Sequence, residues 1–194
     1  MKTSYKYLVL LSLLAACRLT STDVEPDLPS GRPDGSNILV AYRVGGRPVV
    51  ANNAADFGTF IGALFGARQP VSARMAPDST LSIRALDSNN QPDGYPQHDL
   101  TLVIRRFRGP GTYALDLPPG RYGTGNTVYE EYLGSTRQGA QYPVAGARNQ
   151  LLVSAWSSAT GTLQGTFELR VAGTRNPQSP ADLTDGRFDV DVQR

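Results

Sequence analysis

The stretch VAYRVGGRPVV, residues 40–50, shows the pattern that decides the fold class. Val40, Tyr42 and Val44 alternate with a small and a polar neighbour, and a Gly-Gly pair follows directly. A period of two places one kind of side chain on each face of a β-strand, and two glycines supply a tight turn. The stretch therefore predicts a β-hairpin.

The same alternation recurs along the rest of the chain. Apolar residues at every second position, bounded by clusters of Gly, Pro and Asn, occupy the runs 71–75, 81–85, 100–104, 113–117, 151–156, 163–171 and 188–192. Many short strands joined by short connections favour antiparallel pairing. We therefore predict an all-β domain, a mostly antiparallel β-sandwich, with a β-barrel as the alternative.

One segment, residues 53–67, departs from this pattern. Its large apolar side chains fall at the spacing of one helix face: Phe57, Phe60, Ile61, Leu64 and Phe65. This spacing predicts one short helix near residues 54–66, and an irregular loop is the alternative.

The N-terminus has the pattern of an export signal. Lys2 and Lys6 precede a short apolar run that ends in LLAAC, residues 13–17. The run is shorter than the roughly 20 residues that a membrane-spanning helix needs. A basic head, a short apolar segment and small residues before a cut site are typical of a secretory signal peptide. We therefore predict a signal peptide over residues 1–16.

Cys17 is the only cysteine of the chain and follows two alanines. This stretch resembles the lipobox of bacterial lipoproteins, in which the cysteine is linked to a diacylglyceryl group and becomes the new N-terminus. The resemblance implies that Cys17 carries acyl chains, including palmitate; an ordinary signal peptide with a chance cysteine is the alternative. Residues 17–37, rich in Pro, Ser, Asp and Gly, then read as a flexible tether, and residues 38–194 as a single β-rich domain.

Removal of residues 1–16 also changes the charge of the protein. Both lysines are lost, so 17 arginines remain against 17 acidic residues and the side chains sum to zero. A neutral domain has no overall electrostatic attraction to nucleic acid. We therefore predict no nucleic-acid partner, and without a second cysteine no disulfide can form within the chain.

Few catalytic arrangements fit this composition. His98 is the only histidine, so zinc sites with several His or Cys ligands and Cys-His nucleophiles are excluded. Its neighbour Asp99 would face the opposite side of a strand and could not orient it, and the adjacent Glu130 and Glu131 would diverge likewise. We therefore predict no enzyme, no cofactor and no metal, with a carboxylate-dependent hydrolase acting on glycans as the alternative.

Residues 121–142 are our candidate ligand-binding segment. They combine several glycines and weak strand alternation with four tyrosines, Tyr122, Tyr129, Tyr132 and Tyr142. Loops carry binding residues more often than core strands do, and tyrosine is enriched at binding hot spots. The alternatives are a surface loop with incidental tyrosines, or tyrosines that pack on a half-buried sheet.

Three further stretches resemble a family in their order. They are GPGTY (109–113), LQGTFEL (163–169) and LTDGRFDV (183–190), preceded by YRVGGRPVVA (42–51). Together they resemble an uncharacterised family of bacterial exported lipoproteins, β-rich domains of unknown function with a lipobox at the N-terminus. From the residues themselves we expect these glycines to serve turns, and Tyr113, Phe167 and Phe188 to anchor the core.

The resemblance implies a location but no catalytic residue. We expect a lipoprotein that is held to the outer membrane through Cys17, on its periplasmic face or at the cell surface. We further expect a non-enzymatic binding or structural module of the cell envelope, with a glycan or an envelope protein as its partner.

Overall fold

The computed structural model describes residues 39–53, 69–87, 96–115, 125–134, 136–173 and 179–194. The predicted signal peptide and tether, the predicted helix near residues 54–66 and Tyr122 lie outside these ranges. No helix occurs among the described residues. They form eleven strands: β1 (Leu39–Val44), β2 (Arg47–Asn52), β3 (Val71–Met75), β4 (Leu81–Leu86), β5 (Gln97–Ile104), β6 (Gly111–Ala114), β7 (Val128–Leu133), β8 (Thr136–Pro143), β9 (Gln150–Trp156), β10 (Thr162–Gly173) and β11 (Ala181–Gln193).

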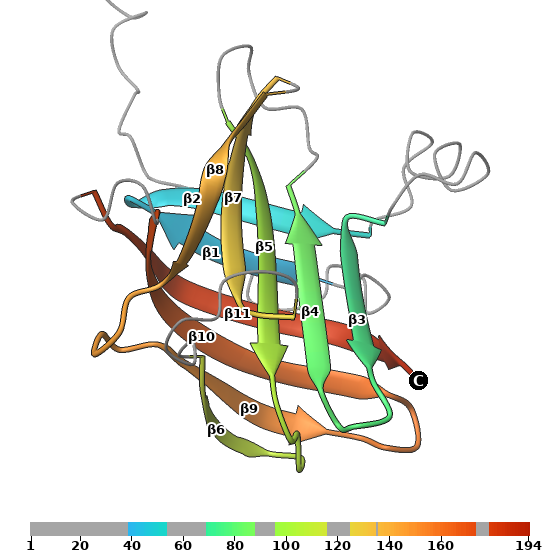
Figure 1. The fold of residues 1–194 in the computed structure, drawn as a ribbon. Helices are drawn as coiled ribbons and strands as arrows, with labels where there is room; N and C mark the ends of the chain where they lie inside the picture. The colour runs from blue at the N-terminus through green and yellow to red at the C-terminus, as the bar shows by residue number, and fades with distance from the viewer. Residues whose placement is uncertain (1–38, 54–68, 88–95, 116–124, 135, 174–178) are drawn as a thin grey trace, which may run out of the picture.

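The strands lie in two layers that cross at a steep angle (Figure 1). One layer holds β3, β4, β5, β7 and β8, and the other holds β2, β1, β11, β10, β9 and β6. The predicted hairpin over residues 40–50 is present as β1 and β2, which pair antiparallel. Every pairing is antiparallel except that between β11 and β3, so the prediction of an all-β, mostly antiparallel domain is confirmed.

Two short pairings connect the layers. β11 pairs with β3 through two residue pairs, and β10 pairs with β8 through three. Since β10 and β11 also pair with each other, strand pairing runs in a ring through β11, β3, β4, β5, β7, β8 and β10. The fold thus has the two packed layers of a β-sandwich and also the closed ring of paired strands of a β-barrel. Both descriptions apply to it.

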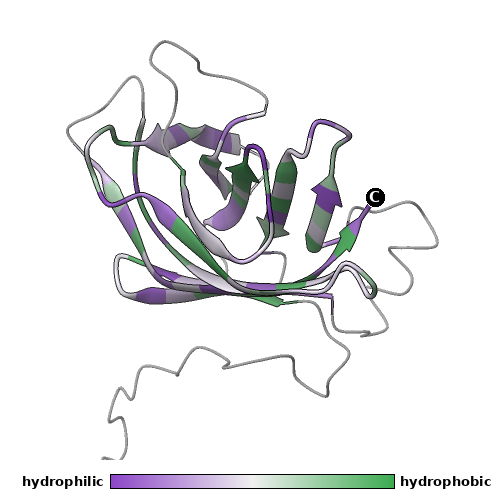
Figure 2. Cartoon of the chain, turned by 90° about the horizontal axis from the view of Figure 1, so that it is seen from below, coloured by the Kyte–Doolittle hydropathy of each residue, from purple (hydrophilic) through white to green (hydrophobic). Residues whose placement is uncertain are grey.

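The core lies between the layers, because the strands place most of their apolar residues on their inward faces. Leu39 and Ala41 of β1 instead form a separate small cluster with Val50. Bands of hydrophobic and hydrophilic residues alternate along the strands (Figure 2). On β10 this alternation is complete from Leu163 to Val171, with every second side chain buried. Phe167 and Phe188 are buried as predicted, and Tyr113 packs partly buried against the same core.

Gly165 and Gly186 lie within β10 and β11, not in turns, so the predicted turn role is wrong for both. Gly165 is paired with Phe188, and Gly186 with Phe167. A β-carbon on Gly165 would lie 2.5 Å from Phe188 Cζ, and one on Gly186 would lie 2.6 Å from Phe167 Cδ2. Glycine is needed here because a backbone carbonyl oxygen and the ring of the paired phenylalanine both occupy the space of a side chain; the oxygen belongs to Leu152 at Gly165 and to Phe167 at Gly186.

The tyrosine-rich segment is also different from its predicted form. Its described residues form β7 and β8, which pair with each other in a hairpin, so the expectation of a loop is wrong for them. β7 also pairs with β5, and its Tyr129 is fully buried in the core. β7 thus contributes one large aromatic side chain to the core, where other strands contribute several aliphatic ones.

Candidate functional site

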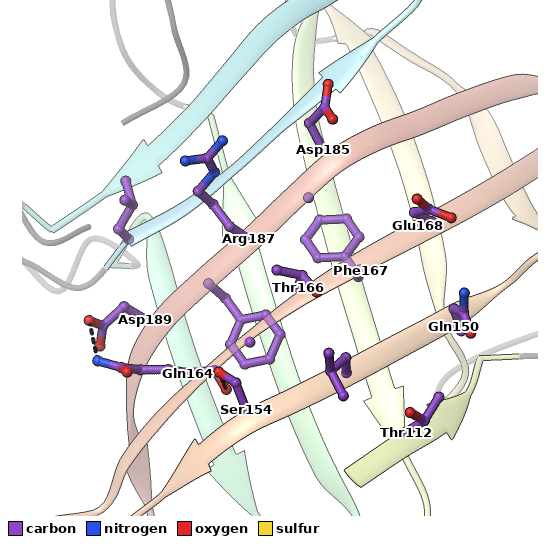
Figure 3. A pocket seen from close by; sticks show the side chains of 15 residues that line it. Thr112, Gln150, Ser154, Gln164, Thr166, Phe167, Glu168, Asp185, Arg187 and Asp189 are labelled. Carbon is purple, nitrogen blue, oxygen red and sulfur yellow. Dashed lines mark hydrogen bonds between the residues drawn. The ribbon is translucent and has the colours of Figure 1, made fainter. Parts of the chain in front are cut away.

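A groove of about 690 Å³ lies on the outward face of the layer that contains β10 and β11 (Figure 3). It extends from β1 across β11, β10 and β9 to β6. Its volume is within the range of about 300–1,000 Å³ that ligand sites usually have. The residues that line it are Leu39, Thr112, Gln150, Leu152, Ser154, Gln164, Gly165, Thr166, Phe167, Glu168, Asp185, Gly186, Arg187, Phe188 and Asp189.

The strand period explains why this face is polar. On β10, inward Leu163, Gly165 and Phe167 alternate with outward Gln164 and Thr166. Neighbouring β9 and β11 follow the same rule, so the side chains of three adjacent strands meet on one surface. The groove therefore offers amides, hydroxyls and carboxylates, which are donors and acceptors for a polar ligand.

The three carboxylates of the groove already have partners. Asp185 lies 3.6 Å from Arg43, and Glu168 lies 3.6 Å from Arg148. Asp189 accepts a hydrogen bond of 2.9 Å from Gln164, drawn as a dashed line in Figure 3. Each carboxylate of the groove therefore already has a partner within the protein.

Exposure makes two of these carboxylates, Asp185 and Glu168, poor candidates for a catalytic acid. The side chains of Asp185 and Glu168 are 62% and 51% exposed. A glycosidase needs one carboxyl that is kept protonated near neutral pH, which burial in an apolar setting provides. Such burial is not found at these two side chains.

A second polar cluster lies at one end of the core and contains the only histidine. His98 Nδ1 is 2.7 Å from Tyr129 Oη, and Tyr129 donates its hydroxyl hydrogen to Glu131 over 2.7 Å. Because that hydrogen is committed to Glu131, the tyrosine oxygen accepts from His98 Nδ1–H. The three residues therefore form a directed chain of hydrogen bonds.

Burial determines the protonation states of His98 and Tyr129. It lowers the pKa of His98, a shift that the carboxylates of Glu131 and Asp87 oppose. Burial also raises the pKa of Tyr129 well above its ordinary value, with contributions from Tyr42 and the hydrogen bond to Glu131. His98 is therefore neutral at pH 7 and Tyr129 is a phenol. Tyr129 is fully buried, so its hydroxyl is not exposed at the surface.

The neighbouring carboxylates point away from this cluster, as the sequence predicted. Asp99 forms a bidentate pair with Arg84, with distances of 3.0 Å to Nε and 2.5 Å to Nη2. Glu130 pairs with Arg137 and accepts a hydrogen bond of 2.8 Å from Tyr132. What the sequence missed is the partner of His98, which is Tyr129 and lies 31 residues along the chain.

The predicted tyrosine site does not coincide with the groove. Tyr129 is buried and presents no face to a ligand at the surface, and the hydroxyl of Tyr132 is bonded to Glu130. Tyr142 is half-buried on β8, and none of these three lines the groove. In the sequence, the groove is visible only as polar residues at alternate positions, which every strand with one solvent face shares.

The described part of the chain contains neither a cluster of metal ligands nor a membrane-spanning helix. Among its residues, no three or more His, Cys, Asp or Glu side chains are arranged to hold a metal ion. In the same part of the chain, no helix has the length and apolar character needed to cross a bilayer.

No protein-family model matches the chain, and neither the curated proteins nor the solved structures searched contain a match. The resemblance to exported lipoproteins therefore stays a prediction.

Proposed function

We propose that this chain is a lipid-anchored lipoprotein of the cell envelope whose outward groove binds a ligand without altering it chemically. The anchor is supported by Cys17 at the end of an export signal. The observation that carries the binding function is the polar groove of about 690 Å³ over β9, β10 and β11. The outer membrane is the proposed location.

A glycan suits this groove better than an envelope protein does. Protein interfaces usually have an apolar centre rich in aromatic side chains. Among the described lining residues, Leu152 is the only large hydrophobic side chain that is exposed, at 45%. Hydroxyl, amide and carboxylate groups surround it and match the hydroxyls of a sugar chain.

A carboxylate-dependent hydrolase acting on glycans is the second candidate. It is favoured by one observation, the presence of Glu168, Asp185 and Asp189 in the same groove. The exposure of two of these side chains favours binding over catalysis.

The two exposed leucines of the described strands allow a matched test. We expect Leu152→Arg to reduce glycan binding on an array at least about tenfold, because the longer charged side chain fills the groove. Leu133→Arg is the control, since Leu133 is 50% exposed and lies outside the groove. Both variants should keep the melting temperature of the wild type.

Two results would count against the proposal. Equal binding by the wild type and Leu152→Arg would place the ligand elsewhere. Release of new reducing ends from a bound glycan, abolished by Glu168→Gln, would favour the hydrolase instead.

A further inference from the structure

Arg187 has no partner for its charge among the described residues. It lies half-buried on β11 and lines the groove. Its guanidinium forms no hydrogen bond or ion pair with any residue that the structure describes. A partly desolvated arginine without an anion is costly, because five N–H donors lose water without replacement.

The neighbours of Arg187 show why it is unpaired. Across the strands it faces Ala41 on β1 and Thr166 on β10, which carry no charge. Along β11 it lies between Asp185 and Asp189, as Figure 3 shows. Asp185 is engaged by Arg43 and Asp189 by Gln164. The guanidinium therefore remains available to a ligand.

We propose that Arg187 binds the carboxylate of an acidic saccharide that lies in the groove. This rests on the proposed function and names its ligand class. A guanidinium matches a planar carboxylate through two parallel hydrogen bonds.

The charge around Arg187 favours a singly charged group over a phosphate. Asp185 and Asp189 each lie two residues from Arg187 on β11 and line the same groove. Their repulsion grows with the ligand's charge, so a dianionic phosphate is more strongly disfavoured than a carboxylate of one charge.

The rest of the saccharide has suitable partners nearby. Gln150, Ser154 and Thr166 line the same groove and can bind sugar hydroxyls. Leu152 supplies an apolar contact for the carbon face of a ring. One guanidinium beside hydroxyls and amides, in a groove whose carboxylates already have partners, suits a uronic or sialic acid residue within a chain of hydroxylated sugars.

Acidic oligosaccharides and their methyl esters provide the test, because esterification removes the charge and keeps the hydroxyls. The full-length protein is titrated calorimetrically with oligosaccharides of galacturonate, glucuronate, mannuronate and N-acetylneuraminate, each beside its methyl ester. We expect at least one acid to bind about tenfold or more tightly than its ester.

Variants assign the preference to Arg187. Arg187→Gln should abolish the difference between acid and ester, and Arg187→Lys should reduce it, since an ammonium lacks the planar fork. Arg74→Gln, an exposed site on β3 outside the groove, should leave the difference unchanged. Should Arg187→Gln not fold, the lysine variant and the wild-type comparison still decide the matter.

The outcomes separate this inference from the proposed function. Equal binding of acids and esters, lost in Leu152→Arg, overturns the role of Arg187 and leaves a glycan-binding groove. An acid preference that survives Arg187→Gln also overturns it. Failure of every saccharide, charged or neutral, to bind overturns both.

Discussion

Tyr42 and Tyr129 show how one residue type serves two different purposes in this core. Both are fully buried. Tyr129 joins His98 to Glu131 through its hydroxyl, whereas the hydroxyl of Tyr42 has no hydrogen-bond partner in the described structure. Tyr42 instead contributes its ring, which lies 5.8 Å from the ring of Phe167. The two hydroxyls should therefore affect stability in opposite ways.

We predict that Tyr129→Phe destabilises the protein by about 1–3 kcal/mol, because His98 and Glu131 lose a partner in a desolvated place. Tyr42→Phe should change the free energy of unfolding by less than about 0.5 kcal/mol or raise it, because an unpaired hydroxyl is removed from the core. Urea unfolding of the two variants beside the wild type measures both changes. A loss in Tyr42→Phe as large as that in Tyr129→Phe would contradict the assignment.

For single residues, the sequence predicts which face of a strand a side chain lies on better than it predicts which residue that side chain contacts. Alternation along a strand was sufficient to place His98 and Asp99 on opposite faces, and likewise Glu130 and Glu131. The contact of His98 with Tyr129 depends on how β5 and β7 pair, and no local pattern specifies that register. The sequence cannot show that Arg187 is unpaired for the same reason, since its neighbours come from β1 and β10.

Among the strands, the pairing of β10 with β11 is the longest and is fixed by a repeated Gly-x-Phe pattern. It occurs at 165–167 in β10 and at 186–188 in β11. Because the strands are antiparallel, each glycine faces the phenylalanine of the other. A shift of one residue would pair Phe167 with Arg187 or Asp185 and put the buried faces of the two strands on opposite sides, and a shift of two residues in one direction would set ring against ring. The pattern therefore specifies a single register.

We predict that Gly165→Ala costs about 3 kcal/mol of stability, because its β-carbon would overlap the ring of Phe188 and the carbonyl of Leu152. Gly45→Ala is the control. Its β-carbon would meet nothing within 4 Å, so only its left-handed φ of 55° adds a cost, of about 1 kcal/mol. Thermal unfolding compares the two. Similar losses in the two variants would show that crowding by Leu152 and Phe188 around Gly165 is unimportant.

For the whole molecule, local periodicity predicted the all-β class because it requires only neighbouring residues. The closure of the pairings depends on contacts between distant ones, such as Val192 with Ala73. This parallel pairing and the crossing of the layers have no signature within a single strand. The groove follows from the same arrangement, since it spans five strands that come from both halves of the chain.

The last prediction concerns the proposed lipid anchor at Cys17. We expect Cys17→Ala to release the protein from the membrane fraction or to leave an unprocessed precursor, because stable anchoring takes more than one acyl chain. Ala16→Gly is the matched control, since it keeps a small residue before the cut site and the cysteine after it. Fractionation with labelled palmitate measures attachment and acylation together. Unchanged attachment of a processed Cys17→Ala protein would exclude the lipid anchor and show that another contact holds the protein at the membrane.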